Sequence, residues 1–192
     1  MASTIKTNNI TGFSGGAGSA PITLSGDTAT LSGTGVTFPA GHIIQTTHNS
    51  YFSGYSATTT SATTAKVSDG SGNYYWKGTI SNLKSGNDVL INFNFVASAD
   101  ISDEFGGGSF ALYRDDTIIY EGTSDLNITI YAGGASRVIN YQTINIHYLD
   151  ERPSATSHTY FLGYSAYNST GVLVRSQSGF APFIAVVQEI QT

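Results

Sequence analysis

The clearest pattern along the chain is an alternation of apolar and polar residues with a period of two. Val89, Ile91, Phe93 and Phe95 take one set of positions, and asparagines stand between the last three of them. Successive side chains of a strand point to opposite faces, so this pattern predicts a strand over 89–96 with one buried face. No window shows apolar residues recurring with the spacing of a helix.

The same alternation predicts further strands. Residues 144–148 form one, with His147 on its polar face, and residues 158–167 form a long aromatic one. Residues 183–190 are apolar at both sets of positions, which predicts a central strand. Glycine-rich segments such as 106–108 are expected to be turns. Shorter strands are predicted at 43–48, 65–68, 74–80, 110–114, 118–120, 127–131 and 172–175.

About eight to ten short strands at this spacing, joined by turns, indicate an all-β fold. We therefore predict an antiparallel β-sandwich, with a jelly roll as the first choice. The pattern changes in residues 1–41, which contain eight of the 22 glycines and two aromatic residues. The chain is accordingly expected to have two parts, an extended Gly/Ser/Thr-rich arm over 1–41 and a β-sandwich domain over 42–192.

The arm contains a short repeat. Thr-Leu-Ser-Gly occurs at 23–26 and again at 30–33, and each copy predicts a short strand closed by a glycine turn. One such strand buries almost nothing, but three copies of the arm around a three-fold axis would share an apolar line. The alternatives are a disordered tail and a segment that orders only on a partner surface. The trimer contacts predicted for the arm are Ile22, Leu24, Leu31, Val36 and Phe38.

The composition argues against several classes of function. Charged residues make up 11% of the chain, against a usual ~25%, and the formal net charge is −5. The eight basic residues are scattered, so nucleic-acid binding is not expected. No apolar run is long enough to insert into a membrane, and the first residues do not resemble a signal peptide, so we expect cytoplasmic synthesis without Sec-type export. The absence of cysteine excludes disulfides, thiol catalysis and thiolate zinc sites.

Candidate chemistry is sparse. The four histidines lack the close spacing of a ligand pair and are interpreted as surface or interface residues; the alternative is an axial metal site with one histidine from each of three chains. Asp100, Asp103 and Glu104 match no calcium-loop spacing and are interpreted as a solvated loop. No serine lies in a nucleophile elbow, although a carboxylate pair for glycoside cleavage is defined only in space. We expect no catalytic residue, no metal ligand, no cofactor and no enzymatic activity.

One group of aromatic residues lies among serine, threonine, asparagine and glycine in the first part of the domain. Tyrosine in such company is typical of recognition surfaces, and aromatic faces stack on sugars. The group is therefore a candidate ligand-recognition surface, with packing between subunits as the alternative. Its members are Tyr51, Tyr55, Tyr74, Tyr75 and Trp76.

Both ends of the chain resemble one family. The start over 1–10 reads MASTIKTNNI, the junction over 36–45 reads VTFPAGHIIQ, and the last strand over 183–190 reads FIAVVQEI. These segments are similar to those of short virion proteins of tailed bacteriophages, many from marine and cyanobacterial viruses. The junction is the specific part of the resemblance.

The resemblance implies a homotrimeric, non-enzymatic component of the virion surface. Its partners would be other virion proteins, either the major capsid protein or a tail component. The role expected first is a capsid decoration or head-fibre protein anchored by the arm. The alternative is a tail-fibre element or receptor-binding knob that recognises a host surface glycan. The family carries no catalytic motif that could be transferred to this chain.

Overall fold

The chain forms two compact units, Met1–Ala40 and Gly41–Thr192. The computed structural model describes residues 9–10, 22–25, 28–31, 40–51, 55–69, 71–101, 105–122, 128–131, 138–154, 156–167, 171–176 and 182–192. The division falls one residue before the boundary expected from composition.

The N-terminal unit contains a small antiparallel sheet. Its strands are β1 (Asn9–Ile10), β2 (Ile22–Ser25) and β3 (Thr28–Leu31), in that order across the sheet. The register places Ile22 opposite Leu31 and Leu24 opposite Ala29. The two repeats thus supply the two strands of one hairpin within a single chain. Val36 and Phe38 lie outside the described residues, and the trimeric arrangement of the arm stays a prediction.

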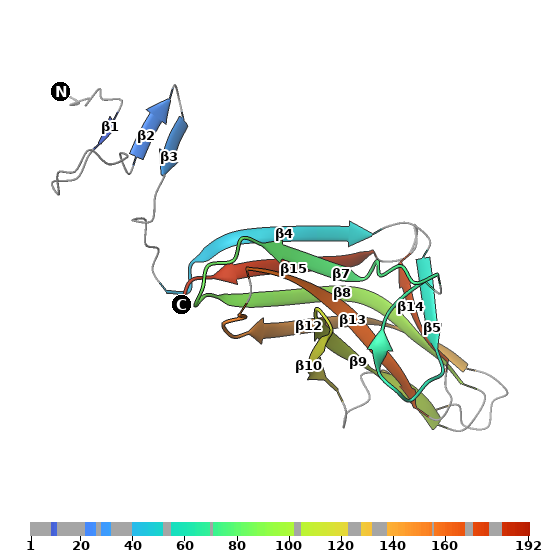
Figure 1. Ribbon diagram of the computed structural model, residues 1–192. Coiled ribbons are helices and arrows are strands. Elements are labelled where there is room, and N and C mark those ends of the chain that lie inside the picture. Colours follow the sequence, from blue (N-terminus) through green and yellow to red (C-terminus); the bar gives the residue numbers. More distant parts are fainter. Residues whose placement is uncertain are drawn as a thin grey trace. The chain divides into compact units, whose positions relative to one another are not determined.

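The domain consists of two six-stranded antiparallel sheets (Figure 1). The first sheet contains β4 (Ile43–Tyr51), β5 (Tyr55–Thr59), β8 (Asp88–Ile101), β12 (Val138–Asp150), β14 (Gly171–Ser176) and β15 (Phe183–Ile190). The second sheet contains β6 (Ala65–Lys66), β7 (Lys77–Ser81), β9 (Phe105–Arg114), β10 (Thr117–Glu121), β11 (Ile128–Tyr131) and β13 (Ser157–Tyr167). The described residues include no helix, and hence none that could span a membrane.

The main strands pair in a nested order. β4 pairs with β15, β7 with β13, β8 with β12, and β9 with β10 and β11. The first strand of this series thus meets the last, the second meets the second-last, and so on inward. A long hairpin whose two arms are rolled into two facing sheets gives this order, which is that of a jelly roll. The predicted fold class, an all-β antiparallel sandwich, is confirmed.

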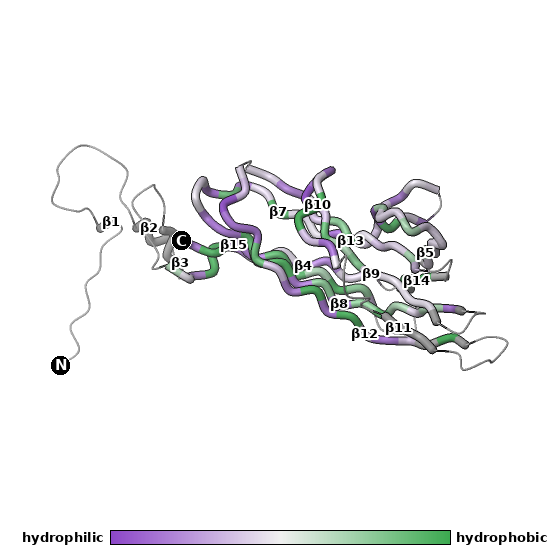
Figure 2. Tube along the Cα trace, turned by 90° about the horizontal axis from the view of Figure 1, so that it is seen from below, coloured by the Kyte–Doolittle hydropathy of each residue, from purple (hydrophilic) through white to green (hydrophobic). Residues whose placement is uncertain are grey.

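The core lies between the sheets and follows the predicted alternation. On β8, Val89, Ile91, Phe93 and Phe95 are fully buried, whereas the asparagines between them are half-buried on the outer face. β13 of the second sheet contributes alternate buried residues from Tyr160 to Ala166. Figure 2 shows hydrophobic and hydrophilic residues alternating along the strands of the first sheet. β15 pairs with strands on both sides, so its prediction as a central strand is also confirmed.

The glycine triplet over 106–108 is not a turn, and that prediction is wrong. It belongs to β9, where Gly108 pairs with Ile128 on one side and with Ala166 on the other. A Cβ atom added to Gly108 would lie 2.5 Å from the Ser165 carbonyl oxygen and would collide with the side chain of Val172. The glycine is therefore needed because β13 and β14 approach closely, rather than because the chain turns.

We expect Gly108→Ala to lower the free energy of unfolding by about 2 kcal/mol or more, because the added methyl group meets backbone that cannot easily move. Urea unfolding of the full-length protein measures this change. Ser109→Ala, at the next position of the same strand, is the control and is expected to change stability by less than about 0.5 kcal/mol. Equal stability of Gly108→Ala and the unmodified protein would contradict the close packing.

Candidate functional site

The aromatic residues predicted to form a recognition surface do not lie together on the surface. Trp76 is buried, with 1% of its surface exposed, and its indole Nε1 has no hydrogen-bond partner in the described part of the chain. Tyr75 packs edge-on against Trp76 at 6.3 Å and against Tyr51 at 6.2 Å, and both tyrosines are partly buried against the core. The prediction of a surface role is wrong for Trp76, because alternation along this segment turns its ring inward with Ile80.

The other two members of that group lie elsewhere. Tyr74 is 41% exposed, and its ring meets the edge of Phe161 at 5.7 Å. The ammonium group of Lys66 lies 4.3 Å from the centre of the Phe161 ring, so these residues form a small cation–π cluster. Tyr55 lies on β5, and its side chain is outside the described residues.

The histidines occupy separate places. His147 is exposed on β12, as predicted, and its Nδ1 shares a hydrogen bond with Asn92 Oδ1. His158 is buried, and its Nδ1 lies 2.7 Å from Asp115 Oδ2. The described residues contain no group of three or more side chains suited to a metal ion. The axial histidine site depends on a trimer and stays a prediction.

The acidic group predicted to form a loop is partly in a strand. β8 continues to Ile101, so Asp100 belongs to it and pairs with Ile139 of β12. The loop prediction is therefore wrong for Asp100, because Ala97 and Ala99 continue the buried face beyond the expected end of the strand. Asp103 and Glu104 lie outside the described residues.

A hydrogen-bonded polar cluster is centred on Asp150, which is buried. Asp150 accepts hydrogen bonds from the Tyr160 hydroxyl at 2.8 Å and from Arg114 Nη1 at 2.7 Å. Burial and the neighbouring Asp150 carboxylate raise the pKa of Tyr160, so its hydroxyl stays protonated and donates. Partial burial acts to raise the pKa of Asp115, but hydrogen bonds from Thr159 N–H and His158 outweigh it, and the pKa is lowered. Each of these groups has a partner, which is typical of a structural cluster.

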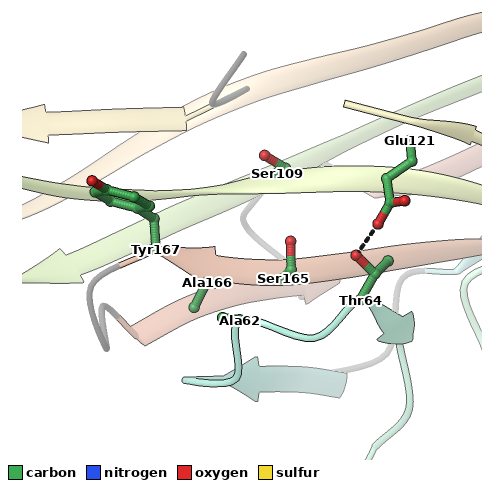
Figure 3. A pocket seen from close by; sticks show the side chains of 7 residues that line it. All are labelled: Ala62, Thr64, Ser109, Glu121, Ser165, Ala166 and Tyr167. Atoms are coloured by element: carbon green, nitrogen blue, oxygen red, sulfur yellow. Dashed lines mark hydrogen bonds between the residues drawn. The ribbon is translucent and has the colours of Figure 1, made fainter. Parts of the chain in front are cut away.

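A recess lies on the outer face of the second sheet, because small residues occupy neighbouring positions of two strands. The register pairs Gly163 with Ala111 and Ser165 with Ser109 on β13 and β9. The Tyr113 ring covers Gly163, and a pocket of about 200 Å³ opens beside it at Ser109 and Ser165 (Figure 3). These two serines form the floor of the recess.

Two segments from opposite sides of the floor form a wall of the recess. On one side, the loop over 60–64 is held to β13 by a 2.7 Å hydrogen bond from Ala166 N to Ser61 O. On the other side, β10 ends at Glu121 beside β9. Thr64 Oγ1 donates a hydrogen bond to Glu121 Oε1, and this contact joins the two sides (Figure 3).

The groups that line the recess are mainly neutral and polar. Ser109 and Ser165 are half-buried, and neither hydroxyl has a hydrogen-bond partner among the described residues. Tyr167, 45% exposed, stands at the rim. Glu121 is the one charged residue of the lining within the described chain. Burial, and then the charge of Glu121, raise the pKa of the nearby Tyr113.

This arrangement can bind a small polar molecule but is poorly equipped for reaction. Glycoside cleavage uses two carboxyl groups, whereas the described lining contains one. A serine nucleophile needs an adjacent base, and no histidine belongs to the described lining. The sequence analysis does not predict this site, since Ser109 and Ser165 form a floor only once their strands are paired.

Comparison with known proteins identifies no family for this chain. No protein-family model matches the chain, and no curated protein matches it. Among solved structures, a chain from the structure of infectious bursal disease virus, Gx strain, aligns over 79% of this chain with 10% identity and a TM-score of 0.23. The alignment spans 41% of that viral chain, and a TM-score this low supports no inference about function.

Proposed function

We propose that this protein is a non-enzymatic structural protein of a tailed-bacteriophage virion, displayed on the particle as a capsid decoration or head-fibre protein. The observation that carries the proposal is the division into a small N-terminal unit and a separate jelly-roll domain. The resemblance of both chain ends to phage virion proteins suggests a role for each of the two units. The N-terminal unit is the anchor, and the domain is the displayed part.

The N-terminal unit suits an anchor because its strands are too short to enclose a core. They are two to four residues long, and isolated sheets of this size are marginally stable in water. Such a unit gains stability when copies of it associate or when it lies on a partner surface. A homotrimer held together by the arm and bound to another virion protein satisfies both conditions.

The domain suits display because the chain enters it at one end of the sandwich and the recess lies toward the other. The entry point is fixed by backbone hydrogen bonds. Gly41 N donates to Gln191 O at 2.6 Å, and Gln191 N donates to His42 O at 2.9 Å. Ser157, at the start of β13, lies near this end, because it pairs with Ser81, whose carbonyl accepts a bond from Gln45. At about 3.3 Å per residue, Ser165 and the recess lie roughly 26 Å farther along β13. The recess thus lies far from the residues at which the chain enters the domain.

We expect deletion of residues 1–41 to abolish attachment to the particle and to convert a trimer into a monomer, because the domain keeps its own core. Co-sedimentation with particles lacking the protein measures attachment, and native mass spectrometry measures the assembly state. Tyr167→Ala, at the far end of the domain, is the control and should attach normally. A full-length protein that is monomeric, or a deletion variant that still attaches, would refute the proposal.

The alternative placement is a tail fibre or a receptor-binding knob. The aromatic group gives this alternative little support, because Trp76 is buried and Tyr51 and Tyr75 pack on the core. Imaging of particles that carry a labelled copy separates the two placements. Label over the capsid supports a decoration protein, whereas label confined to the tail supports the alternative.

A further inference from the structure

The dimensions of the recess limit the size of its ligand. Pockets that enclose drug-sized molecules usually measure about 300–1,000 Å³. The recess, at about 200 Å³, is smaller and opens from a flat floor of strand residues. It can therefore hold one small ring or a single terminal unit of a longer molecule.

The hydrogen-bonding groups of the floor suit a ligand with neighbouring hydroxyl groups. Ser109 and Ser165 are directly paired, and the Cβ atoms of such residues lie about 4.5–5.5 Å apart. Each serine hydroxyl can donate one hydrogen bond and accept others, and neither is used within the described part of the chain. Both hydroxyls are only half-buried, so a bound polar molecule can replace the water that would otherwise hydrogen-bond to them.

The charge of the recess selects against anions. No lysine or arginine belongs to the described lining, whereas Glu121 contributes a carboxylate. That carboxylate accepts one hydrogen bond from Thr64 and retains further acceptor sites. A phosphate, a nucleotide or an acidic sugar would meet repulsion without a compensating cation. A neutral ligand can instead donate hydroxyl hydrogen bonds to Glu121.

An aromatic face completes the site. Tyr167 stands on β13 two residues beyond Ser165, at the rim of the recess (Figure 3). An exposed tyrosine ring gives a flat apolar contact at low conformational cost. The apolar C–H face of a pyranose ring fits such a contact while its hydroxyl edge faces the serines.

We infer that this recess binds one neutral pyranose ring, either as a free sugar or as the terminal unit of a glycan. Tyr167 contacts a face of the ring, Ser109 and Ser165 hydrogen-bond to adjacent hydroxyl groups, and Glu121 accepts a hydrogen bond from a further hydroxyl group. The site differs from the aromatic group considered first and does not depend on the virion assignment. It would function whether the protein stands on a capsid or on a tail.

The inference is tested by titrating full-length protein with the methyl glycosides of glucose, galactose, mannose and N-acetylglucosamine. N-acetylneuraminic acid serves as the anionic comparison. We expect at least one neutral sugar to bind with a Kd on the order of 1 mM, as measured by calorimetry. Amide chemical-shift changes should concentrate at Thr64, Ser109, Glu121 and 165–167, and the acid should bind measurably more weakly.

Variants then assign the contacts. Tyr167→Ala is expected to raise Kd about fivefold or more through loss of the ring contact. Ser165→Ala, which removes the hydroxyl without adding bulk to the floor, is expected to raise it by a similar factor of about five. Tyr141→Ala is the matched control, because Tyr141 is 46% exposed but lies on the first sheet. It should leave Kd unchanged.

Three results would overturn the inference. The first is that none of the neutral sugars shows saturable binding. The second is that the amide chemical-shift changes are centred outside the recess. The third is that Tyr167→Ala does not alter Kd. Thermal unfolding shows whether each variant is folded. If Ser165→Ala fails to fold, the titration of the unmodified protein and of Tyr167→Ala still decides the question.

Discussion

Replacing Glu189 with alanine is expected to lower the free energy of unfolding by about 3 kcal/mol. Glu189 is 1% exposed, and its carboxylate accepts hydrogen bonds from Gln45 Nε2 at 2.7 Å, Lys84 N at 2.8 Å and Asn87 Nδ2 at 2.6 Å. Alanine would leave these donors without their acceptor, and Asn87 is itself buried. Urea unfolding of the full-length protein, followed by tryptophan fluorescence, measures the loss.

Two further variants separate the hydrogen bonds from a general effect on β15. Gln188→Ala, at the adjacent position, removes one bond to Thr46 Oγ1 and should cost less than about 1 kcal/mol. Glu189→Gln keeps the length of the side chain but replaces one acceptor with a donor, so an intermediate loss is expected. Similar stabilities for Glu189→Ala and Gln188→Ala would mean that the carboxylate does not hold this end of the domain together.

The strands that the sequence predicted best are those with one buried face. In β8, large apolar residues alternate with asparagine, and in β13 the inward positions run from Tyr160 to Ala166. Burial on one side of a sandwich requires this period, so the sequence carries it directly. Where the residues become small, the pattern weakens. The predicted strand ends at Val96, because Ala97, Ser98 and Ala99 do not differ enough in polarity to continue the alternation.

Glycine and aromatic residues misled the prediction where their meaning depends on distant strands. The triplet over 106–108 has the composition of a turn, but β13 and β14 make it a site of close packing. Trp76 stands among polar residues, yet the alternation that buries Ile80 also buries Trp76. Extending the period-two rule through the predicted strand over 74–80 would have placed Trp76 in the core.

The recess could not be predicted because it depends on register. Ser109 and Ser165 become neighbours only when β9 and β13 pair with one particular offset, and a shift by one residue would turn their side chains to the other face. The wall has the same origin, since Thr64 and Glu121 meet across two intervening strands. A linear sequence shows which residues could bind a sugar but not which of them are brought together.

Replacing Phe95 with alanine is expected to cost about 4 kcal/mol, the largest effect of any single change proposed here. Phe95 lies on the first sheet, and its fully buried ring meets the edge of Phe110 on the second sheet at a centroid distance of 5.0 Å. It also lies 6.4 Å from the ring of Phe183. Truncation would leave a cavity between the two sheets, because backbone pairing on both sides prevents the core from closing around it. Denaturant unfolding measures the loss.

Comparison with two other changes shows whether the cost comes from the core between the sheets. Phe95→Leu fills most of the space and should cost about 1.5 kcal/mol. Phe161→Ala removes the same type of ring from the outer face of the second sheet, where it is half-buried, so a loss of about 1 kcal/mol is expected. If Phe95→Ala cost no more than Phe161→Ala, the two sheets would not share the core described above. The nested strand pairs would then have to be stable without it, which sheets of this size rarely are.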